Sequence, residues 1–199
     1  MNGEIQERLL HRLGNDSTRE EMEKIDTEIW NEYGRELAIL ISDMSGFSRI
    51  TKEYGIIHFL SLIAKQHELV LPVIPGHGGR LVKAEADNLF IAFDTPEGAV
   101  RASREMHARL EEYNQDKSDT NSIIACHGLS WGLVLDFGND MYGNPVNMAS
   151  KLGEDIADPY ETLITTELRE ACGDEIKKYE FEAKEVKISG VDLSYFRVT

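Results

Sequence analysis

Residues 37–47, with the sequence LAILISDMSGF, form the stretch around which the chain is organised. The apolar run 38–41 predicts a buried strand, which stops at Ser42 and Asp43. A turn through Gly46 follows, and a helical pattern begins directly behind it. Because a helix N-terminus binds anions and a carboxylate binds cations, this arrangement suggests an anion or metal site.

The composition is that of one globular domain with a modest extension. The chain has 199 residues, of which 41% are apolar and 29% are charged, so it can bury a sizeable core. We expect a helical extension over residues 1–36 and one domain over residues 37–199. The net charge of -15 argues against a general binder of nucleic acid or anionic membranes, because such partners require a basic surface. An anionic substrate would need a divalent cation as mediator.

The cysteines and the apolar runs indicate a cytoplasmic protein. Cys126 and Cys172 lie far apart and form no CxxC pair, which favours reduced thiols over a disulfide framework. The N-terminus has no basic-then-apolar signal pattern, and the longest apolar runs are shorter than the ~20 residues of a membrane helix. We therefore expect a soluble chain without membrane insertion.

Two amphipathic helices are predicted before residue 35. Apolar residues recur at helical spacing in two groups, Ile5, Leu9 and Leu13, then Met22, Ile25, Ile29 and Tyr33. Ser17 or Thr18, with Glu20 or Glu21 three residues later, makes a capping box, and Gly34 fits just past the second helix. We favour packing of this pair on the domain over a role as dimerising or signal-receiving helices.

The remaining elements alternate in an order that indicates the fold. Helices are predicted over 48–74, from the Thr95 cap, and from an Asn144 cap. Strands are predicted over 80–85, 88–93, 123–135, 162–165, 179–183, 186–188 and 196–198, with a last hairpin through Ser189 and Gly190. This order predicts an α+β fold with a ferredoxin-like βαββαβ core and extra C-terminal strands. The immediate hairpin at 80–93 argues against a regular doubly wound sheet.

Two aspartates are expected at one edge of this sheet. Asp43 ends the first strand, and Asp87 lies at the tip of the 80–93 hairpin. In a ferredoxin-like sheet the first two strands run parallel with the third between them, so both carboxylates reach the same edge. Two such oxygen ligands suit Mg²⁺ or Mn²⁺ bound to a polyphosphate, and backbone N–H groups of Ser45, Gly46 and Phe47 could hold phosphates.

Strict alternation divides the second strand into two faces. It places Leu81, Lys83 and Glu85 on one face, and Arg80, Val82 and Ala84 on the other.

Three segments resemble the signature blocks of the class III nucleotidyl cyclase homology domain. They are ISDMSGFS (41–48), VKAEADNLFIAF (82–93) and DMYGNPVNMASKL (140–152). The resemblance spans most of residues 37–199. It implies a homodimer with active sites at the subunit interface, and conversion of ATP to cyclic AMP and pyrophosphate with two Mg²⁺ or Mn²⁺ ions. The 3'-hydroxyl would attack the α-phosphate.

The same resemblance assigns roles to individual residues. Asp43 and Asp87 match the metal-binding aspartates, and Met44 matches the residue that offers its backbone carbonyl to a metal. Lys83 and Asp140 match the pair that reads adenine.

Two further positions match groups that act on the ribose and phosphate. Asn147 matches the asparagine that orients the ribose, and Lys151 stands where the family usually has an arginine that stabilises the transition-state phosphate. In the implied dimer, one chain supplies the metal aspartates and the other supplies these residues with the adenine pair.

Three departures from the family pattern keep alternatives open. Lys151 lacks the planar fork of arginine, Ala86 stands where glycine is common before the aspartate, and the connection 132–140 is short for a dimer arm. One alternative is a catalytically silent domain that binds nucleotide or serves signalling. The other is a cyclase that uses GTP or a pyrimidine nucleotide.

Overall fold

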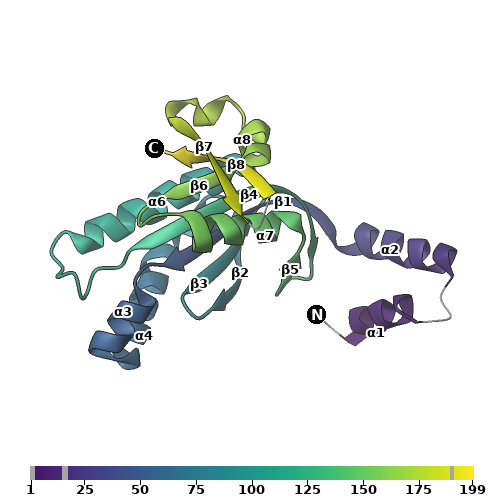
Figure 1. Cartoon of the computed structure of the whole chain (residues 1–199), viewed down its shortest axis with the longest axis horizontal. Helices are drawn as coiled ribbons and strands as arrows, with labels where there is room; N and C mark the ends of the chain where they lie inside the picture. Colours follow the sequence, from purple (N-terminus) through teal and green to yellow (C-terminus); the bar gives the residue numbers. More distant parts are fainter. Residues whose placement is uncertain (1–2, 15–17, 189–190) are drawn as a thin grey trace.

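An eight-stranded sheet forms the centre of the molecule (Figure 1). This computed structural model describes residues 3–14, 18–188 and 191–199. The strands are β1 (Gly34–Met44), β2 (Gly79–Glu85), β3 (Asn88–Phe93), β4 (Ala125–Asp136), β5 (Met141–Tyr142), β6 (Thr162–Thr165), β7 (Phe181–Ile188) and β8 (Val191–Val198). Their order is β2-β3-β1-β4-β6-β8-β7, and β5 pairs with β4.

The first four long strands confirm the predicted ferredoxin-like arrangement. β1 pairs antiparallel with both β3 and β4, and β3 pairs antiparallel with β2. β1 and β2 therefore run parallel with β3 between them, so the end of β1 and the β2–β3 turn lie at the same edge. β6, β8 and β7 extend the sheet beyond β4.

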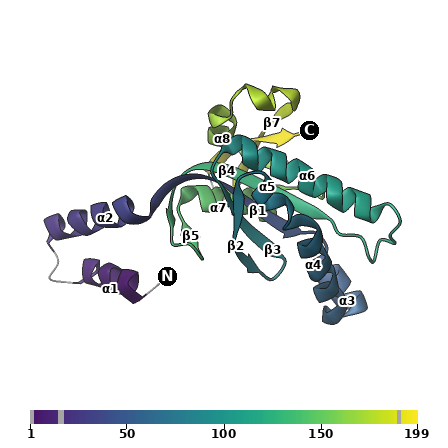
Figure 2. The same ribbon diagram turned by 180° about the vertical axis from the view of Figure 1, so that it is seen from behind.

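Helices cover the two faces of the sheet unequally (Figures 1 and 2). The helices of the domain are α3 (Phe47–Tyr54), α4 (Ile56–Val70), α5 (Val73–Gly76), α6 (Pro96–Asn114), α7 (Asn144–Ser150) and α8 (Thr166–Ala171). α4, α5 and α6 lie on one face and α7 on the other. Alternate residues of β1 face opposite sides of the sheet. Leu40 belongs to the larger core, whereas Ile39 and Ile41 belong to the smaller core beside α7. By the same alternation, Asp43 lies on the face of Ile39 and Ile41.

Several predicted boundaries were wrong. The single helix over 48–74 is interrupted at Gly55, which has φ +84, so α3 and α4 form a bent pair. The cap of α7 is Gly143, with φ +152, rather than Asn144. The two strands predicted over 179–188 are one strand, β7, and β8 is longer than predicted. The predicted hairpin residues Ser189 and Gly190 lie outside the described residues.

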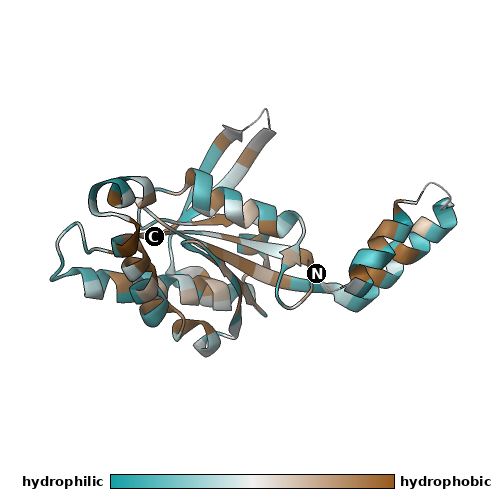
Figure 3. Cartoon of the chain, turned by 90° about the horizontal axis from the view of Figure 1, so that it is seen from below, coloured by the Kyte–Doolittle hydropathy of each residue, from teal (hydrophilic) through white to brown (hydrophobic). Residues whose placement is uncertain are grey.

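The N-terminal helices α1 (Gly3–Arg12) and α2 (Arg19–Tyr33) stand apart from the sheet (Figures 1 and 3). Thr18 and Glu21 form the predicted capping box, and α2 ends at Gly34. The two helices bind each other through a bidentate Arg12–Asp26 ion pair. The pair is joined to the sheet mainly where α2 runs into β1, so it packs on the domain less than we expected.

One stretch of the described residues, Ile56–Gly76, is long and apolar enough to cross a membrane by length and composition. It forms α4 and α5, and its Phe59, Leu62 and Val70 are buried in the protein core. A core helix meets the same criterion, so the stretch gives little support for a membrane span.

Candidate functional site

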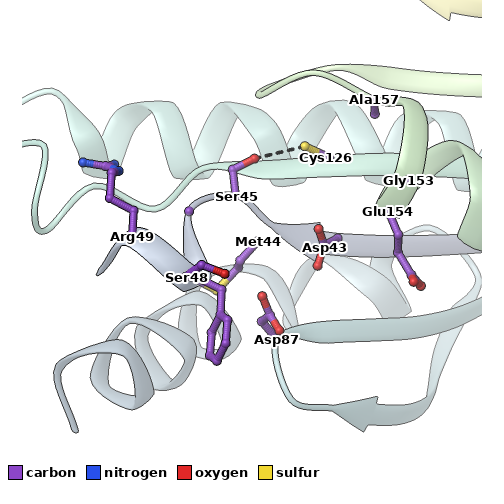
Figure 4. Close-up of a pocket in the computed structure, with 12 residues that line it drawn as sticks. Asp43, Met44, Ser45, Ser48, Arg49, Asp87, Cys126, Gly153, Glu154 and Ala157 are labelled. Atoms are coloured by element: carbon purple, nitrogen blue, oxygen red, sulfur yellow. Dashed lines mark hydrogen bonds between the residues drawn. The ribbon is translucent and has the colours of Figure 1, made fainter. Parts of the chain in front are cut away.

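A cavity of about 600 Å³ lies at the edge where β1 ends (Figure 4). Its lining residues come from the end of β1, the start of α3, the β2–β3 turn, β4 and the turn after α7. They are Asp43, Met44, Ser45, Gly46, Phe47, Ser48, Arg49, Asp87, Cys126, Gly153, Glu154 and Ala157. The volume is in the range of small-molecule sites.

The two predicted aspartates meet in this cavity. Asp43 lies opposite Cys126 of β4, and Asp87 lies at the tip of the β2–β3 turn. Figure 4 shows both carboxylates facing the same space. Burial raises the pKa of Asp43 to about 7, and the charges of Asp87 and Glu154 add to the rise. Burial also raises the pKa of Asp87 above its usual range.

These carboxylates fit a divalent cation that takes its other ligands from elsewhere. In the part of the chain that the structure describes, no cationic side chain pairs with either carboxylate. The same part holds no group of three or more His, Cys, Asp or Glu side chains arranged around a metal. Asp43 and Asp87 would therefore share an ion with backbone, water or substrate oxygens, as is common for Mg²⁺. Met44 lines the cavity and could offer its carbonyl.

The turn after β1 offers fewer free N–H groups than predicted. The Ser45 N–H already donates to the carbonyl of Ile124 at 2.9 Å, so it is not available to a phosphate. Gly46 is the cap of α3 with φ +98, and Phe47 is its first residue, so their N–H groups have no partner within the helix. The phosphate contact predicted for three residues is thus reduced to Gly46 and Phe47.

The turn that carries Asp87 is strained at its first residue. Ala86 has φ +53, in the left-handed region that favours glycine. This requirement explains why glycine is common here in the signature block that the sequence resembles. Alanine accepts the conformation at a cost of about 1–2 kcal/mol.

Lys83 and Asp140 form a second cluster, outside the cavity. Lys83 Nζ lies 3.0 Å from Asp140 Oδ1 and 3.0 Å from Glu85 Oε1, and 4.6 Å from the centre of the Phe90 ring. Burial lowers the pKa of Lys83, but the bonds with Asp140 and Glu85 outweigh it and raise the pKa above its usual value. Tyr142 donates to Asp140 Oδ2 at 2.9 Å. The adenine-reading pair of the sequence hypothesis is thus adjacent within one chain.

A β-bulge at Val82 sets the face on which Lys83 lies. Leu81 pairs with Ile91, but Lys83 pairs with Phe90, so the register shifts by one between them. Leu81 and Lys83 therefore lie on opposite faces, and the prediction that they share a face was wrong. The bulge directs Lys83 to the face that also carries Asp43, since Phe90 lies opposite Ile41 of β1.

Arg80 was not singled out in the sequence, yet it holds the turn that carries Asp140. Because of the bulge, Arg80 shares a face with Lys83. Its guanidinium binds the Asp136 carboxylate and donates to the carbonyl of Gly138 at 3.0 Å. β2 thereby anchors the connection between β4 and β5.

Asn147 and Lys151 lie on the helix that follows this connection. Lys151 ends α7 and begins a π-helical segment, η1 (Lys151–Ile156), and its Nζ lies 3.2 Å from Asp155 Oδ2. The helix packs tightly on β4, because a Cβ on Gly128 would lie 2.0 Å from the carbonyl oxygen of Ala149. Neither Asn147 nor Lys151 lines the cavity of Asp43.

Two charged residues of the cavity were missed by sequence reasoning. Glu154 lies within the π-helical segment η1 and adds a third carboxylate to the lining. Arg49 lies in the first turn of α3 and points away from the two aspartates (Figure 4). Only the position of Arg49, three residues after Gly46, could have signalled a place near the anion-binding turn.

Comparison with known proteins finds one curated relative and several solved structures that are named as cyclases. No family model matches the chain. The "Putative adenylate cyclase 3" of Rhizobium meliloti is 26% identical over 133 residues, which cover 67% of this chain and 22% of that protein. The chain therefore matches less than a quarter of that relative's length.

Two solved structures share the fold. An adenylate/guanylate cyclase/hydrolase from Silicibacter pomeroyi has a TM-score of 0.73 at 24% identity, covering 83% of this chain and 97% of the other. The guanylyl cyclase Cya2 has a TM-score of 0.71 at 21% identity, covering 83% of this chain and 92% of the other. At these identities the likeness establishes the fold.

Proposed function

Because the chain has the fold of class III nucleotidyl cyclase domains, we propose that it converts ATP to 3',5'-cyclic AMP and pyrophosphate. The observation that carries this proposal is the meeting of Asp43 and Asp87 in one cavity beside the turn at Gly46. Two half-buried carboxylates without a cationic partner favour a divalent ion, and a divalent ion allows an acidic protein to bind a triphosphate.

The proposed reaction is an internal displacement at the α-phosphate. The ribose 3'-oxygen forms a bond to the α-phosphorus, and the bond from that phosphorus to the bridging oxygen of the β-phosphate breaks. Pyrophosphate leaves, and the 3'-hydroxyl proton passes to solvent. Divalent ions held by Asp43 and Asp87, Mg²⁺ or Mn²⁺, would neutralise phosphate charge and favour loss of this proton.

The remaining site residues bind and orient the nucleotide in this proposal. Lys83 and Asp140 read the adenine edge, Asn147 orients the ribose, and Lys151 stabilises charge on the reacting phosphate. Lysine supplies a point charge rather than the bidentate fork of arginine.

We also propose that two copies of the chain complete each active site. The residues assigned to the metal, Asp43, Met44 and Asp87, line the cavity. The residues assigned to the base, ribose and phosphate do not line it; they are Lys83, Asp140, Asn147 and Lys151. A second chain in a homodimer could bring these groups to the metal. The rate of cyclic AMP formation would then increase more than in proportion to protein concentration, over the range in which part of the protein is monomeric.

An assay of all four ribonucleoside triphosphates tests this function directly. With Mn²⁺ and a range of protein concentrations, we expect cyclic AMP from ATP, and we expect Asp43→Ala and Asp87→Ala to abolish it. Equally low product from the wild type and both variants at high protein concentration would refute the proposal. Preferential turnover of another nucleotide would keep the chemistry and change the base.

A non-catalytic nucleotide-binding role is the competing function, and it is favoured by the ion pair that Lys151 makes with Asp155. Tight ATP binding and dimerisation without turnover across several metals would support it. We place either activity in the cytoplasm, because Cys126 and Cys172 are both free thiols.

A further inference from the structure

Tyr142 donates a hydrogen bond to the carboxylate that we assign to the base. The distance from its hydroxyl to Asp140 Oδ2 is 2.9 Å. The other oxygen, Oδ1, accepts from the backbone N–H of Met141 at 2.9 Å and lies 3.0 Å from Lys83 Nζ. The carboxylate thus has a donor at each oxygen before any ligand binds.

These contacts leave little freedom for a further donor. An ionised carboxylate has about four lone-pair sites, and Met141 and Lys83 occupy those of Oδ1. Tyr142 occupies one of those of Oδ2, which leaves one acceptor position on that oxygen. A base that donates to Asp140 must therefore approach beside Tyr142.

The ring of Tyr142 is held in place by its neighbours. Tyr142 belongs to β5 and pairs with Leu135 of β4. Its ring lies 5.8 Å from that of Phe137, whose backbone N–H donates to the Asp140 carbonyl. Phe137 lies 4.9 Å from Tyr33 at the end of α2. The row Tyr33, Phe137 and Tyr142 therefore links the N-terminal extension to Asp140.

We propose that Tyr142 is a positioning residue that fixes Asp140 as an acceptor and so determines which purine the site accepts. This rests on the proposed function, in which Asp140 reads the base. The exocyclic amine of adenine can donate to the open position on Oδ2. The corresponding oxygen of guanine would face a carboxylate held in its charged form, which is repulsive.

The fixed carboxylate also stays ionised. Burial raises the pKa of Asp140, but the hydrogen bonds from Lys83, Tyr142 and Met141 outweigh it and hold the pKa below the usual range. Without the hydroxyl of Tyr142, Oδ2 could rotate or bind water, and discrimination between an amine and a carbonyl would weaken.

Equilibrium titration with nucleotides that cannot cyclise tests this role. The probes are α,β-methylene analogues of ATP and GTP with Mn²⁺, titrated calorimetrically into the full chain. We expect the wild type to prefer the ATP analogue, so that the Kd of the GTP analogue is larger than that of the ATP analogue. Tyr142→Phe should reduce the ratio of the first Kd to the second by about tenfold. Tyr142→Phe keeps the ring against Phe137 and removes only the hydroxyl.

The matched control is Tyr160→Phe. The Tyr160 hydroxyl likewise takes part in one side-chain hydrogen bond, which it accepts from Asn114 Nδ2 at 3.0 Å. It does not contact Asp140, so loss of this hydroxyl should leave the ratio unchanged. A purely structural role of Tyr142 would weaken both analogues equally. The proposal is overturned if Tyr142→Phe keeps the wild-type ratio while Asp140→Asn loses it, or if the wild type binds both analogues equally. Since no turnover is needed, absence of cyclic AMP formation would refute the activity without affecting this result.

Discussion

The carboxylate cavity and the Lys83 cluster differ in how their charges are balanced within one chain. In the cavity, Asp43 and Asp87 face each other with Glu154 nearby, and no cation offsets them among the residues that the structure describes. In the other cluster, Lys83 and Asp140 pair with each other. In our proposal the first region receives a cation from outside, whereas the charges of the second are already paired before a ligand arrives.

This difference indicates that the carboxylate cavity, and not the Lys83 cluster, gains stability when a ligand binds. Half-buried like charges destabilise the folded chain until a metal binds, since repulsion and desolvation both oppose ionisation. The Lys83–Asp140 pair costs little in the free protein, but a base must share its hydrogen bonds. Metal affinity should therefore depend on the cavity alone, and base choice on the pair.

The largest expected effect separates the two regions by metal binding. Asp43→Asn should lose the rise in Tm that Mn²⁺ gives the wild type, because binding to the folded state stabilises it by mass action. Cyclic AMP formation should fall by on the order of 10²–10³-fold. Asp140→Asn is the control. Calorimetry with and without Mn²⁺ should show the same rise in Tm for Asp140→Asn as for the wild type. An unchanged shift in Asp43→Asn would contradict the metal assignment.

A smaller effect is expected at Lys151. If its charge acts on the transition state, Lys151→Ala should lower kcat by about 10²-fold and change the affinity for a methylene ATP analogue much less. Lys151→Arg should retain most activity, since it keeps the cation. Asp155→Asn is the matched control, because it removes only the ion-pair partner of Lys151. An equal loss in affinity and kcat/KM for Lys151→Ala would assign the lysine to ground-state binding.

Much of the fold, and the meeting of Asp43 and Asp87 in one cavity, followed from the sequence, because both depend on local patterns and chain order. The apolar run before Asp43 and the short hairpin at Asp87 predicted a shared edge, and the strand order confirms it. Gly55 could have indicated the break between α3 and α4. The apolar residues on both sides continue at helical spacing, however, and an isolated glycine is tolerated inside a helix, so the sequence predicted one helix.

The details of the second cluster could not be predicted in the same way. The bulge at Val82 arises from the pairing of β2 with β3, so alternation within β2 alone gives the wrong face for Lys83. The Tyr142 contact depends on a strand of only two residues, and the Ser45 N–H is occupied by a carbonyl far along the chain. Each is a tertiary contact without a local sequence signature.

A pH dependence would sharpen the contrast between the regions. The folded-state pKa of Asp43 is about 7, above the 3.8 of an unperturbed aspartate, so the wild type loses stability as pH rises through this interval. Asp43→Asn should be more stable than the metal-free wild type above pH 7, and this advantage should vanish near pH 4. Allowing for solvent screening, we expect on the order of 1–2 kcal/mol from urea unfolding in EDTA.

The stability of Asp43→Asn must be compared with that of the wild type at each pH, because a buried histidine pair also makes stability depend on pH in this range. His107 and His127 stack at 4.0 Å, and burial lowers the pKa of His107 to about 4 and that of His127 well below its usual value. Both favour unfolding as pH falls below about 6.5. This contribution is common to wild type and variant, so it cancels. A difference that does not change with pH would show that burial and the neighbouring carboxylates do not raise the pKa of Asp43.

The smallest expected effect concerns the turn that carries Asp87. Ala86→Gly should relieve the left-handed strain at φ +53, which costs about 1–2 kcal/mol, against about 0.5–1 kcal/mol for the added flexibility of glycine. We therefore expect a gain in stability of at most about 1.5 kcal/mol and an unchanged Mn²⁺ response. Ala84→Gly, the same replacement within β2, should destabilise the fold. If both variants lose stability equally in urea, the turn is not strained, and alanine at position 86 has no structural cost.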